Sequence, residues 1–410
     1  MKKKLLFKNS FLLSSSQIVS RAIGFLYYIF LARNLPVENF GIYTFTLAFV
    51  YNFFPVADFG LERLVLKDIS RDSSKAQYYF SRLLPLRIIL GVFSVFLILL
   101  LGLILGQNSR QIFYFLLFGL SIIPYNLTFI IASIQNAREK MHYSALANLL
   151  AILFTVFWGI IFIRAGLSLS FIITAFLLSY SIVFLLFFLL LKKMDLRFLL
   201  VWDFGFCRNL LSQSWQFAVF LIIGVFYLRL SVVMVGLLSG AESSGIYGSS
   251  YKFIEALVLV PQSIALALFP VFSRLYLENK SKLKDLYFKS LGFLFILSLP
   301  IFAVFWFLPE LIIRYSYGEK YLSAMIVYPA LAIASVLFFL NSLPGNIIQV
   351  SEKPKRFLPF SIANFLFLLF LCFYLIPKYG LIGAGWAVVG GEIFGLLTNN
   401  WYVLKILKSN

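Results

Sequence analysis

The sequence is poor in the residue types on which most enzymes and metal sites depend. Its 410 residues include one histidine and two cysteines, and 16 acidic residues stand against 35 basic ones. Cys207 and Cys372 lie in different apolar segments, which indicates neither a disulfide framework nor a metal site. The single histidine, His142, has no second ligand near it in the sequence. We therefore expect neither a metal nor a cofactor.

Sequence motifs for catalysis are also absent. The chain has no P-loop, no glycine-rich dinucleotide motif and no arrangement of a nucleophile with histidine. An ATP-driven pump is excluded within this chain, because nothing in it would bind the triphosphate. We expect a protein that is not an enzyme.

Apolar side chains, by contrast, are abundant. The sequence is 61% hydrophobic and 12% charged, with a mean hydropathy of +0.94, against roughly 45–50% apolar and about 25% charged residues in soluble domains. At about 20 apolar residues per span, we expect an all-α polytopic membrane protein of about twelve transmembrane helices. The expected spans are 9–33, 39–62, 83–106, 111–135, 143–164, 168–191, 209–237, 244–273, 287–309, 322–349, 357–377 and 381–404.

The basic residues divide unequally between the two sides of the predicted membrane. With the N-terminus inside, six lysines and arginines fall in outer connections, three within spans and the remaining 26 on the inner side. This bias follows the positive-inside rule. We therefore expect both termini on the cytoplasmic side of the inner membrane, and we interpret the net charge of +19 as a topology signal rather than a nucleic-acid surface. The basic loops near 63–82 and 274–289 also suit anionic lipid head groups.

A weak internal repeat relates the two halves of the chain. The segment Pro36–Tyr43, with its Glu-x-x-Gly-Ile-Tyr ending, recurs as Gly240–Tyr247 at a shift of 204 residues. Upstream, Ile-Gly-x-x-Tyr at 23–27 recurs at 223–227. Because each half holds six predicted helices, an even number, both halves insert with the same orientation. This is the parallel repeat found in transporters.

The longest central polar connection divides the chain. We expect an N-terminal six-helix lobe at 1–191, a cytoplasmic linker at 192–208 and a C-terminal six-helix lobe at 209–410. Alternating access between two lobes would use such a duplication.

Six ionisable residues lie within the predicted spans: Arg21, Asp58, Arg229, Lys252, Glu255 and Glu392. Charges at membrane depth mark transport pathways by default. Gln17, Arg21 and Tyr28 recur at a spacing that places them on one helix face. We expect Arg21, Arg229 and Lys252 to bind an anionic substrate inside the membrane. Gln17 and Tyr28 would add polar groups to the same surface.

The acidic members of this group have two interpretations. Glu255 is three residues after Lys252 and could form an ion pair with it, and Glu392 could pair with an arginine. Alternatively, both are coupling residues for a proton gradient, because deep burial favours the neutral form of a carboxyl group. Asp58 is a third candidate for an ion pair or for coupling, and we expect it, near the inner end of its helix, to reach the membrane interface.

The second repeat resembles a known family. Residues 227–253, which include Arg229, Ser231 and the Gly-Ile-Tyr motif at 245–247, resemble the helix 7–8 signature of the polysaccharide (O-antigen, Wzx-type) flippases. These flippases belong to the multidrug/oligosaccharidyl-lipid/polysaccharide exporter superfamily. The runs at 20–24, 41–43, 58–63 and 379–387 look like further parts of the same pattern. Ser231 stands where many relatives carry an aspartate.

The resemblance implies two six-helix lobes that form a V-shaped central cavity. It implies a flippase that moves polyprenyl-diphosphate-linked oligosaccharides from the cytoplasmic to the outer leaflet for surface polysaccharides such as O-antigen or capsule. Polysaccharide polymerase machinery would be a further partner. A cation-coupled multidrug or metabolite antiporter of the same superfamily is one alternative. A membrane polysaccharide polymerase or ligase is another, although it would need a large outer loop that the sequence lacks.

Overall fold

The structure, a computed structural model, describes residues 2–351 and 357–408, which form helices and turns and contain no strand. The predicted all-α fold is confirmed. The first helices are α1 (Lys2–Asn34), α2 (Val37–Tyr51), α3 (Phe54–Asp58), α4 (Leu61–Arg71), the 3-10 helix η1 (Ser73–Lys75), α5 (Ala76–Ile104), α6 (Ser109–Gly119), α7 (Ile122–Ala137), α8 (His142–Arg164), α9 (Leu169–Leu189) and the 3-10 helix η2 (Leu191–Met194). They are followed by α10 (Phe204–Leu257), α11 (Leu259–Glu278), α12 (Lys280–Phe307), α13 (Pro309–Ser316), the 3-10 helix η3 (Glu319–Val327), α14 (Tyr328–Asn341), α15 (Pro344–Val350) and α16 (Leu358–Lys408).

Nine helical stretches among the described residues are long and apolar enough to cross a membrane. Two of them, at 204–278 and 358–408, run for 75 and 51 residues, which exceeds two passes through a hydrocarbon core of about 30 Å at a rise of about 1.5 Å per residue. Both contain a glycine with non-helical backbone angles, Gly240 and Gly380, where the chain can reverse. The protein is thus a multi-pass membrane protein, and the count of twelve spans stays a prediction.

The chain folds into two compact units that exchange a segment of helix. The N-terminal unit comprises Met1–Asn34 and Thr46–Val225, and the C-terminal unit comprises Leu35–Phe45 and Phe226–Asn410. The first part of α2 therefore belongs to the C-terminal unit, and the first part of α10 belongs to the N-terminal unit. Both helices run through the boundary without a break. The central connection that we expected to be a linker lies entirely inside the N-terminal unit.

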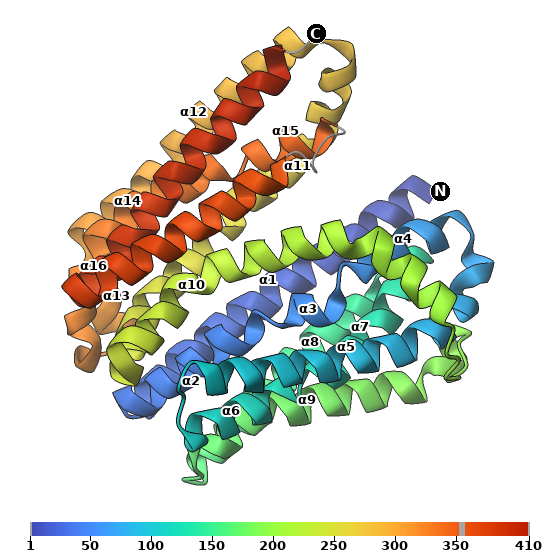
Figure 1. Cartoon of the computed structure of the whole chain (residues 1–410), viewed down its shortest axis with the longest axis horizontal. Coiled ribbons are helices and arrows are strands. Elements are labelled where there is room, and N and C mark those ends of the chain that lie inside the picture. Colours follow the sequence, from blue (N-terminus) through green and yellow to red (C-terminus); the bar gives the residue numbers. More distant parts are fainter. Residues whose placement is uncertain (1, 352–356, 409–410) are drawn as a thin grey trace. The chain divides into compact units, whose positions relative to one another are not determined.

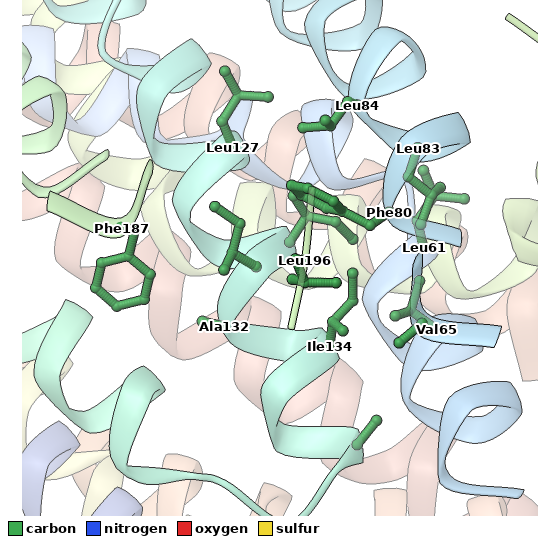
Figure 2. Packing of buried hydrophobic residues seen from close by; sticks show 14 of the residues in the cluster. Leu61, Val65, Phe80, Leu83, Leu84, Leu127, Ala132, Ile134, Phe187 and Leu196 are labelled. Carbon is green, nitrogen blue, oxygen red and sulfur yellow. The ribbon is translucent and has the colours of Figure 1, made fainter. Parts of the chain in front are cut away.

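The N-terminal unit packs its helices along one another. Helix α1 lies along α8, α8 along α9, and α5 along α7 (Figure 1). Figure 2 shows the apolar core at one end of this unit, to which α4, α5, α7, α9 and the connection after η2 contribute. Its labelled members are Leu61, Val65, Phe80, Leu83, Leu84, Leu127, Ala132, Ile134, Phe187 and Leu196. This core fixes the ends of the helices that carry the buried charges described below.

The C-terminal unit is centred on α14. Helix α14 packs against both α12 and α16, and α11 packs against α15 (Figure 1). The segment Leu35–Phe45 joins this unit through η3, where the Lys320 ammonium donates a hydrogen bond to the Leu35 carbonyl at 2.7 Å and the ring of Phe40 meets that of Tyr321 edge to face. The exchanged piece of α2 is therefore fixed by specific contacts.

Gly41 and Gly245, equivalent positions of the sequence repeat, lie against each other in the C-terminal unit. A methyl group added at Gly41 would overlap the carbonyl oxygen of Ala241. One added at Gly245 would lie 3.0 Å from the Cα of Gly41. Because the obstructing atoms belong to backbone, only glycine lets α2 and α10 approach this closely. The repeat thus marks the crossing of two helices.

Candidate functional site

Arg21 lies on α1 with an exposed side chain, as does Gln17 one turn before it. Tyr28, expected on the same polar face, is instead buried at 5% exposure. The rotation of α1 is set by its contact with α8, where the hydroxyl of Tyr27 lies over the Cα of Gly159 and leaves no space for a larger residue there. The structure therefore leaves Arg21 and Gln17 accessible and places Tyr28 inside the unit.

Asp58 takes part in a buried ion pair. One carboxylate oxygen lies 2.7 Å from the Nη2 of Arg87 on α5, and the other accepts a hydrogen bond from the Gly60 N–H at 3.0 Å. The Arg87 side chain is 3% exposed, and its Nη1 is 3.4 Å from the Oδ1 of Asn126 on α7. Asp58, a candidate ion-pair acid, is thus paired with Arg87, and its position at the membrane interface stays a prediction.

The backbone around Asp58 explains this geometry. Helix α3 ends at Asp58, and the next two residues, Phe59 and Gly60, both adopt left-handed backbone angles with φ of 51° and 68°. A methyl group at Gly60 would lie 2.8 Å from the Cβ of Phe217 on α10. The interrupted helix therefore passes close to α10 and exposes its own N–H groups, one of which Asp58 satisfies.

Sequence reasoning missed Arg87 as a site residue. Its position near the start of an apolar span suggested one more basic residue of the inner loop. The available signal was a second charge, Asp58, at similar depth in the preceding span, since intramembrane charges tend to pair. Three buried polar atoms in this region, Arg87 Nε, Asn126 Nδ2 and Asn52 Oδ1, lack a hydrogen-bond partner among the described residues. They remain available to water or to a polar ligand.

Lys252 and Glu255 form an ion pair in the C-terminal unit. The ammonium lies 2.7 Å from a carboxylate oxygen of Glu255, and the two side chains are 28% and 15% exposed. Arg229 is partly buried and has an attractive electrostatic interaction with the same carboxylate. The three charges therefore form one cluster with a net positive charge of one.

Glu392 is the buried acid of the C-terminal unit. Its residue is 3% exposed on α16, and its carboxylate accepts a hydrogen bond at 2.7 Å from the Nδ2 of Asn341 on α14. The hydroxyl of Tyr227 on α10 also hydrogen-bonds to this carboxylate. Asn399 extends the network by donating to the Oδ1 of Asn341 at 3.3 Å. The alternative interpretation, in which Glu392 pairs with an arginine, finds no such partner among the residues that the structure describes.

A match to a protein-family model shows which family the chain belongs to. The family model described as polysaccharide biosynthesis protein matches residues 6–276, about two thirds of the sequence. The chain belongs to this family. A second model, MatE, matches residues 217–375.

Two relatives match along most of the length of the chain. A protein of Shigella flexneri described as "Putative O-antigen transporter" is 25% identical over 388 residues, which cover 88% of each chain. The "Probable low-salt glycan biosynthesis flippase Agl15" of Haloferax volcanii is 23% identical over 92% of this chain and 79% of the relative.

Solved structures show that this family member has a transporter fold. The lipid II flippase MurJ in an inward closed conformation matches with a TM-score of 0.75 at 17% identity, covering 97% of this chain and 89% of that structure. An inward-facing multidrug resistance transporter of the MATE family matches with a TM-score of 0.71 at 14% identity, covering 95% of this chain and 96% of the other. The expected family is confirmed by the family model, and the two solved structures show the fold.

Proposed function

We propose that the protein flips polyprenyl-diphosphate-linked oligosaccharides from the cytoplasmic to the outer leaflet of the inner membrane by alternating access. The family assignment and the names of the two relatives support this activity. The observation that carries it in this chain is the exposed Arg21 on α1, within the predicted span 9–33, since an arginine at membrane depth costs at least about 2.5 kcal/mol unless it has a polar environment or function. Surface polysaccharide assembly would use the product.

The chemistry of the cargo fits an arginine. The planar guanidinium can bond two phosphate oxygens at once, and charge-assisted bonds of this kind are roughly twice as strong as neutral ones. In the C-terminal unit, Arg229 and Lys252 are proposed as further cations for an anionic cargo, with Glu255 as the counter-charge that a diphosphate would displace. Gln17, exposed one turn from Arg21, supplies an amide for sugar hydroxyls.

We assign the coupling of transport to a proton gradient to an acidic residue. Glu255 is already paired with a lysine, whereas Glu392 has neutral partners among the described residues. A proton is the simplest group that would neutralise Glu392 during the transport cycle. We therefore assign proton coupling to Glu392 first and to Glu255 second.

Deletion of the gene and substitution of Arg21 test this proposal. Without the protein, lipid-linked oligosaccharide should accumulate on the cytoplasmic face of the membrane. Arg21→Lys should restore part of the export and Arg21→Ala very little, at equal protein level. Arg164→Ala, which removes an exposed arginine at the end of α8, is the matched control and should export normally. Normal export by Arg21→Ala would refute the assigned role of Arg21.

A second candidate function, cation-coupled drug or metabolite export, is favoured by the MatE match at residues 217–375. Drug accumulation in cells with and without the protein distinguishes the two functions. A difference in drug accumulation, with normal oligosaccharide export in the deletion strain, would favour the antiporter.

The proposed orientation places both termini in the cytoplasm, where the protein would meet the enzymes that build the oligosaccharide. Polysaccharide polymerase machinery would take the product on the other side. Reporter fusions after residue 408 test the position of the C-terminus, and a reporter that is active only in the cytoplasm should be active there.

A further inference from the structure

The connection between η2 and α10 exposes a continuous run of apolar side chains. Residues 198–202 and Phe204, here called the 198–204 segment, are each 36% to 67% exposed. Phe204 is the most exposed, at 67%, and Trp202 is 55% exposed. Six exposed apolar side chains within seven residues are unusual for a loop that faces only water.

Several contacts hold this segment in a defined position. The Gln77 side-chain amide pairs with both the N–H and the carbonyl of Arg197, and the Val201 N–H donates to the Ser81 carbonyl at 3.1 Å. Asp203 forms an ion pair of 3.0 Å with Arg82. The exposed side chains therefore belong to a fixed surface on the first turns of α5.

The residues before the segment attach it to the interior of the unit. Met194 and Leu196 are buried in the apolar core, where Figure 2 shows Leu196 among the packed side chains. The Met194 carbonyl accepts hydrogen bonds from the Arg138 guanidinium at 2.8 Å and the Gln135 amide at 3.1 Å. Since these groups are fixed inward, the apolar run that follows them has little freedom to fold back onto the protein.

The backbone of the segment sets its depth in the membrane. Within the described residues, the N–H groups of Phe198, Leu199, Leu200 and Trp202 make no hydrogen bond. Unpaired backbone groups exclude the hydrocarbon core, where each would cost several kcal/mol. The head-group region accepts both the polar backbone and amphipathic aromatic rings such as Trp202. The segment therefore fits the membrane interface.

Positive charge surrounds this apolar surface. Four exposed basic residues, Lys192, Lys193, Arg197 and Arg208, lie within ten residues of it in the sequence. The two acids nearby are Asp195 and Asp203, and Asp203 is already paired with Arg82. Basic residues beside interfacial apolar side chains favour anionic lipid, up to roughly fivefold for each residue close to the surface.

We propose that the 198–204 segment is a membrane anchor that inserts its side chains between lipid head groups and selects anionic phospholipid through Lys192, Lys193 and Arg197. The anchor holds the start of α10 at the interface. This helix belongs to the N-terminal unit up to Val225 and continues into the C-terminal unit. Anionic lipid at this surface thus contacts the segment from which the connecting helix begins.

Fluorescence of Trp202 in reconstituted vesicles tests the proposal. The probe protein keeps Trp202 and carries phenylalanine at the other five tryptophans, Trp158, Trp215, Trp306, Trp386 and Trp401. Phosphatidylcholine brominated near the glycerol end of its acyl chains should quench Trp202 more than lipid brominated near the chain terminus. Brominated phosphatidylglycerol should quench more than brominated phosphatidylcholine at equal mole fraction.

Variants that lack the basic side chains distinguish insertion of the apolar segment from selection of anionic lipid. In the triple variant Lys192→Gln, Lys193→Gln and Arg197→Gln, the preference for phosphatidylglycerol should fall several-fold while quenching by phosphatidylcholine persists. A probe protein that keeps only Trp306 is the control, since Arg314, the next cation along the chain, is paired with Glu310. The Trp306 preference should not change in the triple variant.

Two results would overturn the anchor. Quenching of Trp202 by aqueous iodide but not by brominated lipid would place it in water, and protection from both would indicate a protein partner. An unchanged lipid preference in the triple variant would overturn selection by these cations. Should the probe protein fail to fold, a spin label at Leu200→Cys in the otherwise native chain gives the same answer, because Cys207 and Cys372 are buried. A label accessible to oxygen but not to an aqueous nickel complex supports the anchor, and the reverse pattern contradicts it.

Discussion

The two compact units bury acidic charge in different ways. In the N-terminal unit, Asp58 meets the guanidinium of Arg87, and the pair is charge-balanced. In the C-terminal unit, Glu392 meets an amide from Asn341 and a phenol from Tyr227, neither of which carries a charge. A balanced pair fixes the ionisation of both partners, whereas neutral donors accept either form of a carboxyl group. The comparison assigns a structural role to the first site and a switching role to the second.

Loss of Arg87 is expected to have the largest effect on stability. Arg87→Met leaves Asp58 without its counter-charge at a partly buried position, and removing one partner of a buried pair typically costs about 3–5 kcal/mol. The variant should show a lower thermal midpoint in detergent and a lower yield from the membrane.

A double variant shows whether the effect of Arg87→Met comes from the lost ion pair or from altered packing of the side chain. Asp58→Asn with Arg87→Met should be more stable than Arg87→Met alone, because no unpaired charge remains. If the loss of stability in the double variant equalled the sum of the losses in the two single variants, the broken ion pair would not be the cause of the effect of Arg87→Met. Arg82→Met, which removes a more exposed arginine of the same helix, is the matched control and should lower the midpoint much less.

Glu392→Gln should change transport more than stability. Glutamine keeps one oxygen to accept from Asn341 and Tyr227, so the loss should stay near the cost of one hydrogen bond, about 1 kcal/mol. Stimulation of flipping by an imposed pH gradient should disappear while cargo binding persists. Glu255→Gln serves as the comparison, since Glu255 has Lys252 as its partner. Retention of the gradient response in both single variants and in the double variant would contradict coupling through these acids.

The sequence predicted the class of fold because hydropathy and charge bias act over long segments, whereas the pairing of single residues depends on tertiary packing. Lys252 and Glu255 were candidates for an ion pair because they are three residues apart on one helix. Asp58 and Arg87 come from different helices, so their contact requires the interruption of the chain at Phe59 and Gly60. Tyr28 shows the same limit, since its burial follows from the packing of α1 on α8 rather than from its own helix face.

The repeat also had a consequence that alignment alone could not predict. Gly41 and Gly245 were matched as equivalent positions, and the structure shows that they touch. Their contact arises because the first part of α2 belongs to the same unit as the second part of α10. A sequence alignment shows which positions of the two repeats are equivalent, but it does not show which of the equivalent helices cross each other.

Alanine at the two repeat glycines should have unequal effects of intermediate size. Gly41→Ala overlaps a backbone carbonyl, and overpacking of this kind typically costs about 1–3 kcal/mol or more. Gly245→Ala, with its nearest atoms at 3.0 Å, should cost less. Gly292→Ala on α12 is the control, because no atom lies within 4 Å of the added methyl group. Thermal midpoints should rank Gly292→Ala highest and Gly41→Ala lowest, and a reversed order of the two repeat glycines would contradict the close crossing of α2 and α10.

The smallest effect is expected at the Asp203–Arg82 pair, an exposed counterpart of Asp58–Arg87. The Asp203 carboxylate caps the start of α10 by accepting a hydrogen bond from the Phe206 N–H, and this bond together with the Arg82 guanidinium holds the pKa of the Asp203 carboxyl below its usual range. Because that pKa is lower in the folded protein, the stabilisation is complete above the unfolded value of about 4 and is lost as the pH falls through the folded value. Trp202 emission in the single-tryptophan protein should therefore stay constant from neutral pH down to about pH 4 and change below it. Asp203→Asn keeps an oxygen for the helix cap but removes the charge, so its Trp202 emission should not respond to acid in this range. A transition of equal size in both proteins would show that another group, and not Asp203, releases the segment.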